Sequence, residues 1–313
     1  MISPEDARRR LIDRLGRIPA PVPPSPPAVD RRFTLEGIAF ERWRLRGPRE
    51  EIPAWFLMAE DAARPAPALL ALHPHGRQFE LGKSLVAGLA GEASRAYGAA
   101  AAREGFGVLI PDLPAFEDRR RPLAERKRNY ALQGEAYERL LAMEALVHGA
   151  TLQGWILADL CACADILALD RRVDVSRLSV IGQSFGGQEA IFAMLYDPRF
   201  RAGIVSCGFS LVKLLFDRSL SHNPALYLPG MIPDLDFDTI VPALAPRPLT
   251  VIAGREDDIF PLEGVEAVAA KARRAWALAG AADRFRLRVF EGRHDLPADE
   301  LREALRWLRA AVS

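Results

Sequence analysis

The amino-acid sequence predicts an α/β protein with a mostly parallel central sheet, and three observations support this fold class. Short apolar runs alternate with stretches of helical periodicity after residue 60, which is typical of parallel strands joined by crossover helices. The preceding segment, 33–59, instead predicts an antiparallel hairpin. A chain of 313 residues that is 50% hydrophobic and 27% charged can also bury the core of one large domain. We therefore expect helices on both faces of the sheet and an antiparallel N-terminal edge.

The first 32 residues are predicted to form a short helix followed by an extended arm. Apolar side chains recur at helical spacing among charges over residues 5–18, and Pro19 should end that helix. Residues 19–30 contain too much proline for a helix or a sheet and predict a polyproline arm. Because arms of this kind often lie across a neighbouring subunit, a homo-oligomer is compatible with the sequence. Residues 33–313 are predicted to form a single domain.

The remaining elements follow from short apolar runs and helical spacing. Two runs around a Gly47-Pro48 turn, 33–46 and 52–59, predict a hairpin at one edge of the sheet. Parallel strands, each short and buried on both faces, are predicted at 68–72, 107–110, 178–181, 203–207, 249–253 and 285–290. Helices are predicted at 92–104, 155–169, 188–196, 262–279 and 298–311.

Two segments do not fit this alternation and are interpreted as cap-like insertions. They cover residues 113–151, which contain the charged run EDRRRPLAERKRN, and residues 209–245, which contain HNPALYLPGMIPDLDFD. Each follows the end of a predicted strand. Since the ligand crevice of a parallel sheet lies outside the carboxyl ends of its strands, we expect the insertions to form walls of a pocket and to determine specificity.

The charge balance and the cysteine content exclude several classes of function. With 42 basic and 41 acidic residues the formal net charge is +1, so no global field attracts nucleic acid, an anionic membrane or a polyanionic substrate. Small neutral or weakly charged substrates are expected. Neither a signal peptide nor a membrane-spanning stretch is recognised, which predicts a cytoplasmic location. The three cysteines lack metal-ligand spacing, so neither disulfides nor a metal site is predicted.

The strongest catalytic signal is the sequence GQSFG at residues 182–186, with Ser184 at its centre. It follows a predicted strand and precedes a predicted helix, which is the context of a nucleophile held at a tight turn. Glycine on both sides permits close approach of the neighbouring chain, and the amino-terminus of the helix favours negative charge. We therefore predict Ser184 as a nucleophile rather than an ordinary turn serine.

A serine nucleophile needs an imidazole base, and His294 is the best of the five histidines. It follows the last predicted strand and precedes the terminal helix, where a loop can return over the nucleophile. His222 and Tyr227 lie in the second insertion and are predicted to contact substrate. His148 lies in a charged helical region and is expected to face solvent, whereas His73 is interpreted as a core histidine bound to neighbouring loops.

The acid that orients the base should lie between nucleophile and base in chain order, at the end of a late strand. The sequence LTVIAGREDDIFP places three carboxylates there. Asp257 is preferred, because the spacing from Gly254 to Asp257 to Pro261 matches the turn that usually presents this acid in α/β folds with a serine nucleophile at a strand-to-helix turn. Asp258 and, less favourably, Glu256 remain alternatives that would otherwise face solvent.

Acyl transfer also needs hydrogen-bond donors for the developing oxyanion. One predicted donor is the backbone N–H of Phe185, which follows the nucleophile. The second is predicted in the loop HPHGRQ after the strand at 68–72, from the backbone N–H of His75 or Gly76. Pro74 has no N–H and cannot donate.

Five blocks of sequence, taken together and in order, are more specific than the serine motif alone. They are HPHGRQFELGKSLVAGLAG, IPDLPAFEDRR, the segment from GATLQGW to VDVSRLSVIGQSFGG, YLPGM, and APRPLTVIAGREDDIFPLEGVE. In these blocks the chain resembles bacterial α/β-hydrolases related to dienelactone hydrolase and the acetyl xylan esterases. The resemblance covers most of the chain from about residue 68. It implies the α/β-hydrolase fold and a cofactor-free triad of Ser184, Asp257 and His294 that acts on esters.

Two departures from that group narrow the expected substrate. Dienelactone hydrolase typically has a cysteine nucleophile, so its lactone activity is not carried over to Ser184. The secreted carbohydrate esterases bear export signals, which this chain lacks, so a small intracellular carboxylic ester is expected. The alternatives are cleavage of an amide or a carbon–carbon bond by the same triad, and a binding protein that kept the fold without turnover.

Overall fold

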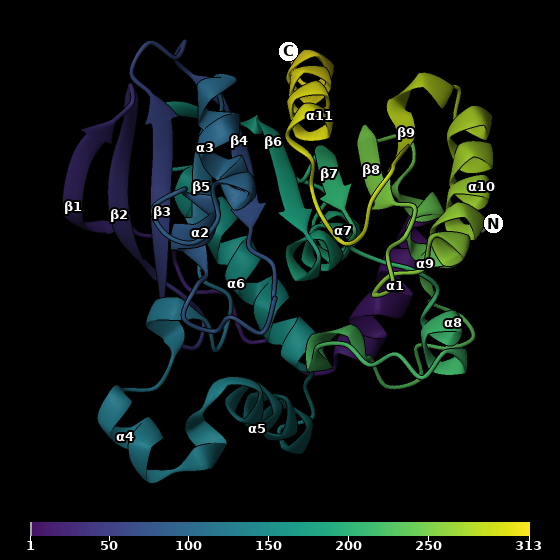
Figure 1. The fold of residues 1–313 in the computed structure, drawn as a ribbon, viewed down its shortest axis with the longest axis horizontal. Coiled ribbons are helices and arrows are strands. Elements are labelled where there is room, and N and C mark those ends of the chain that lie inside the picture. The colour runs from purple at the N-terminus through teal and green to yellow at the C-terminus, as the bar shows by residue number, and fades with distance from the viewer. Residues whose placement is uncertain (1) are drawn as a thin grey trace.

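The computed structural model describes residues 2–313, and these contain a nine-stranded mixed sheet of order β1-β2-β3-β5-β4-β6-β7-β8-β9 (Figure 1). The strands are β1 (Ala28–Leu35), β2 (Ile38–Arg46), β3 (Glu51–Ala59), β4 (Ala66–Leu72), β5 (Gly107–Pro111), β6 (Val173–Gln183), β7 (Ala202–Ser206), β8 (Leu249–Gly254) and β9 (Phe285–Phe290). Pairing is antiparallel from β1 to β5 in this order and parallel from β5 to β9. The predicted fold class is confirmed.

Helices cover both faces of the sheet. They are α1 (Pro4–Leu15), α2 (Lys83–Val86), α3 (Tyr97–Arg103), α4 (Leu123–Arg128), α5 (Gly134–Val147), α6 (Leu152–Leu167), α7 (Phe185–Tyr196), α8 (Val212–Asp217), α9 (Phe237–Ile240), α10 (Leu262–Leu278) and α11 (Ala298–Ala311). Alternate residues of β4 point to opposite sides, as the pleat requires. Leu70 joins a core with α1, α6, α7 and α10, whereas Leu69 joins a second core with α3 and α11.

The antiparallel edge has three strands rather than the two predicted. Glu36 and Gly37 have φ values of 49° and 73°, and this reversal divides the predicted strand 33–46 into β1 and β2. The predicted arm is also shorter, because Ala28 already pairs with Arg44 of β2. Pro27 is the last proline of the run, and the residues after it have the N–H groups that a strand ladder needs. Residues 19–27 form neither helix nor strand.

Helix α1 ends earlier than predicted and packs against the body of the protein. It begins after Ser3, whose side chain accepts a hydrogen bond from the backbone N–H of Asp6. Its last residue is Leu15, because Gly16 adopts a φ of 70° well before Pro19 is reached. Leu11 and Leu15 are fully buried in the core that α1 shares with α7.

The parallel strands lie where they were predicted, with two corrections. Strands β4, β5, β7 and β8 are buried along their whole length, as the prediction required. Strand β9 has the predicted bounds but exposes its middle residues, because it is the edge of the sheet and has one strand neighbour. Strand β6 starts at Val173, five residues before the predicted 178, and leads directly into the segment with Ser184.

The two predicted insertions form mostly short helices outside the sheet. The first contains α4 and α5, which lie beyond one end of the sheet in Figure 1. Several large apolar side chains are exposed there, including Tyr130 at 78% and Val147 at 87%. The second insertion contains α8 and α9. Within residues 2–313, no helix is long and apolar enough to cross a membrane.

Candidate active site

Ser184 lies in a strained turn between β6 and α7. Its φ is 57° and its ψ is −120°, a conformation that L residues rarely adopt, and its N–H donates to the carbonyl oxygen of Ser206 at 2.8 Å. The flanking glycines leave no room for a side chain. A methyl group on Gly186 would lie 1.8 Å from the carbonyl oxygen of Leu72, and one on Gly182 would lie 2.1 Å from Gly186. Close packing therefore forces the turn that presents Ser184.

His294 and Asp257 form a hydrogen-bonded pair at the ends of β9 and β8. The distance from His294 Nδ1 to Asp257 Oδ2 is 2.9 Å. Of the three carboxylates weighed from the sequence, Asp257 is buried, whereas Glu256 and Asp258 are exposed and Asp258 pairs with Arg293. The geometry therefore favours Asp257 over both alternatives as the partner of His294.

Asp257 is held in its ionised form by the groups around it. Its Oδ1 accepts the backbone N–H groups of Ile259 and Phe260, each at 2.9 Å. Burial alone would raise the pKa of Asp257, but the hydrogen bond and charge of His294 together with these two donors lower it below its usual value. A carboxylate in this state fixes the proton of His294 on Nδ1 and leaves Nε2 free.

Ser184 and His294 line the same cavity, which has a volume of about 590 Å³. Predicted residues Phe185, His75 and Gly76 line it as well. Within residues 2–313 no acceptor is found for the backbone N–H of these three residues, which leaves them available to a ligand. The wall also contains charged side chains from both signs that the sequence did not single out: Arg77, Glu92, Arg95, Glu135, Glu138 and Arg139.

Three further residues considered from the sequence occupy different environments. His222 lines the cavity, stacks on Phe260 with ring centroids 4.3 Å apart, and has its pKa lowered to about 4 by burial and by the charge of His294. Tyr227 is not among the lining residues; its hydroxyl accepts the backbone N–H of His222 at 2.8 Å. His148 is exposed at the end of α5.

His73 is a buried core histidine, as interpreted from the sequence. Its Nδ1 lies 3.0 Å from the carbonyl oxygen of Pro74, and its Nε2 accepts the backbone N–H of Leu113 at 3.0 Å. Burial lowers the pKa of His73 to about 4, so the ring is neutral and joins the loops that follow β4 and β5.

Comparison with known proteins identifies the family of the chain. The model of the prolyl oligopeptidase family, Peptidase_S9, matches residues 149–309, which is just over half of the 313-residue chain and includes Ser184, Asp257 and His294. The chain belongs to the prolyl oligopeptidase family. It is therefore a hydrolase with the α/β-hydrolase fold.

Three relatives place this prolyl oligopeptidase family member more closely. It is 27% identical over 310 residues to YtaP of Bacillus subtilis (strain 168), described as a hydrolase, and the match covers 97% of this chain and 98% of YtaP. A Bacteroides fragilis NCTC 9343 structure described as an acetyl xylan esterase has a TM-score of 0.72 at 17% identity, over 92% of this chain and 74% of that one. Acetyl xylan esterase 1 from Thermoanaerobacterium sp. JW/SL YS485 has a TM-score of 0.63 at 19% identity, over 99% and 94%. These likenesses show the shared fold.

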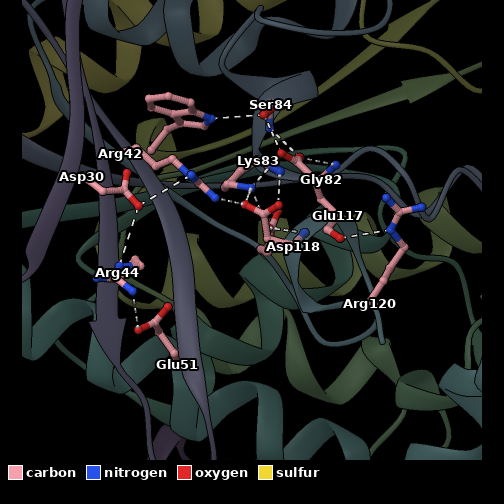
Figure 2. Close-up of polar contacts among 12 residues, drawn as sticks. Asp30, Arg42, Arg44, Glu51, Gly82, Lys83, Ser84, Glu117, Asp118 and Arg120 are labelled. Carbon is pink, nitrogen blue, oxygen red and sulfur yellow. Dashed lines mark hydrogen bonds and ion pairs between the residues drawn. The ribbon is translucent and has the colours of Figure 1, made fainter. Parts of the chain in front are cut away.

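A buried ionic cluster in this family member fixes the end of the loop that carries His75 and Gly76. Figure 2 shows Lys83, at the start of α2, among acidic side chains from the loop after β5. Its Nζ lies 2.8 Å from Asp112, 2.6 Å from Glu117 and 2.7 Å from Asp118. Burial lowers the pKa of Lys83, but the neighbouring carboxylates outweigh it and raise the pKa overall. Sequence inspection missed this cluster, because its members are spread from 83 to 118.

Two sets of side chains in residues 2–313 are close enough to share a metal ion, and both are already engaged. In the first, Cys207 lies beside Asp257 and His294, which are hydrogen-bonded to each other. In the second, Lys83 Nζ contacts Asp112 and the two other carboxylates of its cluster. An ammonium group thus stands where a cation would neutralise the second set.

Proposed function

We propose that this protein is a serine esterase that cleaves a small carboxylic ester through an acyl-enzyme. The observation that carries the proposal is the 2.9 Å contact between Asp257 and His294, with His294 and Ser184 on one cavity. Ser184 acts as nucleophile, His294 as general base and Asp257 as the carboxylate that orients the imidazole. The strained backbone of Ser184 supports its role, because residues with such strain are found mostly at active sites, where the surrounding structure imposes it.

The proposed reaction has two steps that share one histidine. His294 Nε2 takes the hydroxyl proton of Ser184 as Oγ attacks the acyl carbon, and the same proton then goes to the departing alkoxide, which leaves as the alcohol. A water molecule, deprotonated by His294, attacks the acyl-enzyme, and Ser184 leaves with the proton as the acid is released. The backbone N–H of Phe185, with that of His75 or Gly76, donates to the oxyanion in each step.

The cavity supports a neutral substrate of modest size. A volume of about 590 Å³ is in the range of small-molecule sites, and the lining contains three arginines and three glutamates, so neither sign of charge prevails. Phe185 and Phe260 supply apolar surface near Ser184. We propose that His222 contacts substrate from this wall, with Tyr227 holding its backbone.

Hydrolysis of p-nitrophenyl acetate, together with labelling by a fluorophosphonate, tests the proposal. The wild-type chain is expected to release nitrophenol and to label at one serine, and Ser184→Ala is expected to do neither. Thermal unfolding of the variant at the wild-type temperature would show that the fold is intact. A folded wild-type protein that neither labels nor turns over an ester would refute the assignment.

A second candidate function is hydrolysis of an amide bond, and the family match favours it. The family that matches residues 149–309 is named for a peptidase, and the same triad can serve both reactions. Aminoacyl p-nitroanilides assayed beside the nitrophenyl esters separate the two. We expect ester turnover to exceed anilide turnover, and the reverse order would replace esterase by peptidase.

A further inference from the structure

His75 makes a contact that joins the proposed oxyanion loop to the first insertion. Its Nε2 lies 3.0 Å from Oε2 of Glu138 on α5, and its Nδ1 accepts the backbone N–H of Arg77 at 3.2 Å. Because Nδ1 accepts a hydrogen bond, the ring carries its proton on Nε2 and donates it to Glu138. The imidazole therefore connects its own loop with a helix 63 positions away in the chain.

Three aromatic rings contact the same imidazole. Its centroid lies 5.0 Å from that of Phe79, 5.2 Å from that of Phe116 and 5.9 Å from that of Phe185, with each ring nearly perpendicular to it. Edge-to-face contacts of this kind restrict rotation of the ring. A shift of His75 would therefore also disturb Phe185, whose N–H is the other proposed oxyanion donor.

The backbone next to His75 is strained and needs support from outside the loop. Gly76 and Arg77 have φ values of 50° and 56°, so two consecutive residues occupy the left-handed region. For Arg77, which is not a glycine, this conformation costs free energy and persists only where neighbouring contacts impose it. The bond from Arg77 to His75 and the bond from His75 to Glu138 supply such contacts.

Burial of the Glu138 carboxyl group costs free energy that packing alone does not offset. Its side chain is 4% exposed, and within residues 2–313 its one polar contact is the imidazole of His75, whose Nδ1 already accepts a hydrogen bond. No arginine or lysine neutralises it there. Since an ionisable side chain buried without a cation costs free energy, an apolar residue would be the more stable choice at this position if only packing mattered.

We propose that Glu138 is a positioning residue that holds the backbone of the oxyanion loop through His75. The inference rests on the proposed function, because it concerns the donor that stabilises the oxyanion of the ester reaction. On this account the docking of α5 completes the active site: the first insertion supplies a wall of the cavity and also determines the rate of the chemical step.

Three substitutions on α5 test this with p-nitrophenyl acetate. Glu138→Ala removes the acceptor of the His75 hydrogen bond. We expect kcat to fall about 10- to 100-fold and KM to change less than about threefold, since an oxyanion donor acts in the transition state. Glu138→Gln keeps an oxygen that accepts from His75 and should stay within about threefold of wild type. Glu144→Ala is the matched control, because this glutamate lies on the same helix but is 46% exposed and outside the cavity.

Inhibition by phenylboronic acid separates positioning from general destabilisation. This probe forms a tetrahedral adduct with the serine, so its Ki should rise in Glu138→Ala by about the factor that kcat loses. The changes in melting temperature and in KM should be too small to explain that loss. An active wild type with unchanged kcat in Glu138→Ala would overturn the inference and leave the proposed function intact. A parallel loss in Glu138→Gln and Glu138→Ala would also overturn it.

A variant of His75 covers the case in which Glu138→Ala does not fold. His75→Phe keeps an aromatic ring for the three phenylalanine contacts but cannot donate to Glu138. A fall of about 10-fold or more in kcat supports the positioning role, and an unchanged kcat contradicts it. If the wild type itself fails to label with a fluorophosphonate, the proposed function falls, and this inference falls with it.

Discussion

Two buried carboxyl groups near the active site have pKa values shifted in opposite directions. Asp257, at the end of β8, accepts hydrogen bonds from His294 and two backbone N–H groups, and its pKa is lowered. Glu189, on α7, is fully buried beside the side-chain amides of Gln153 on α6 and of its neighbour Gln188. Burial raises the pKa of Glu189 to about 8. The hydrogen bonds from the two side-chain amides oppose that rise, and the charge of Glu138 adds to it.

The difference shows that burial alone does not decide the charge of a group. Neutral amides do not compensate the desolvation of Glu189, whereas an imidazole that can become charged compensates that of Asp257. Asp112 is a third case: it is equally buried and touches the ammonium group of Lys83 at 2.8 Å, yet burial and the charge of Glu117 still raise its pKa to about 7. Substitutions at these groups, at their partners and on α5 test whether a side chain's surroundings, rather than burial alone, decide its effect.

The largest expected effect is on turnover, at Asp257. Asp257→Asn should lower kcat for p-nitrophenyl acetate by about 10³- to 10⁴-fold, because the amide no longer fixes the proton of His294 on Nδ1. Asp258→Asn is the matched control; its carboxylate is exposed and should leave kcat within about twofold. Steady-state kinetics of both variants decide between the two residues, and a larger loss in Asp258→Asn would reverse the assignment.

The next effect is on stability, at Lys83. Lys83→Met removes the cation from a buried cluster of carboxylates and should lower the free energy of unfolding by about 3–5 kcal/mol. Lys271→Met, which breaks an exposed pair with Asp238, should cost at most about 1 kcal/mol. Urea unfolding measures both. Equal losses in the two variants would mean that the Lys83 cluster contributes no more than a surface pair.

Glu189 predicts a dependence of stability on pH. Its pKa is about 8 in the folded protein and near 4.5 in the unfolded chain, so the folded state holds the proton more tightly. The resulting stabilisation is complete below about pH 4.5 and is lost as the pH rises through about 8. Between pH 6 and pH 9 the wild type should lose about 2 kcal/mol more than Glu189→Gln, which does not titrate. Urea unfolding of both proteins at the two pH values measures these losses. An equal loss in wild type and in Glu189→Gln would contradict the raised pKa.

The smallest effect is expected where nothing is buried. Val147 on α5 is 87% exposed, and Val147→Ser should change the free energy of unfolding by less than about 0.5 kcal/mol. Leu141 lies on the same helix at 7% exposure, and Leu141→Ser should cost about 2 kcal/mol or more. Thermal unfolding of the pair tests whether α5 has the buried and exposed faces described above.

The sequence alone predicted the parts of the fold that have a strong local signal. Strand β9 and helix α11 were placed to the residue, because each combines regular spacing with clear ends. The division of the edge strand at Glu36 was missed, since a reversal at a glutamate has no composition signal beyond the glycine that follows it. Helix α5 has 14 residues, but the sequence indicates only a charged helical region around His148 without bounds, because the apolar and charged positions are too mixed to mark one buried face.

The site divides in the same way. Ser184, Asp257 and His294 follow predicted strands, and chain order suffices to propose them as a group. Glu138 could not be found, because nothing in the sequence distinguishes it from the half-buried Glu135 and the exposed Glu144 of the same helix. Its contact with His75 depends on how the insertion folds back over the loop after β4, which is a tertiary event without a sequence pattern.

The close packing at the nucleophile turn has a consequence for reading related sequences. At Gly182 and Gly186 an added methyl group would meet backbone atoms at about 2 Å, whatever residue stood between them. A descendant that lost the hydroxyl of Ser184 would therefore have to keep both glycines in order to fold. In a family alignment, the two glycines indicate that the turn is present. On the proposed function, the residues at 184, 257 and 294 together indicate whether a chain can still act as a hydrolase.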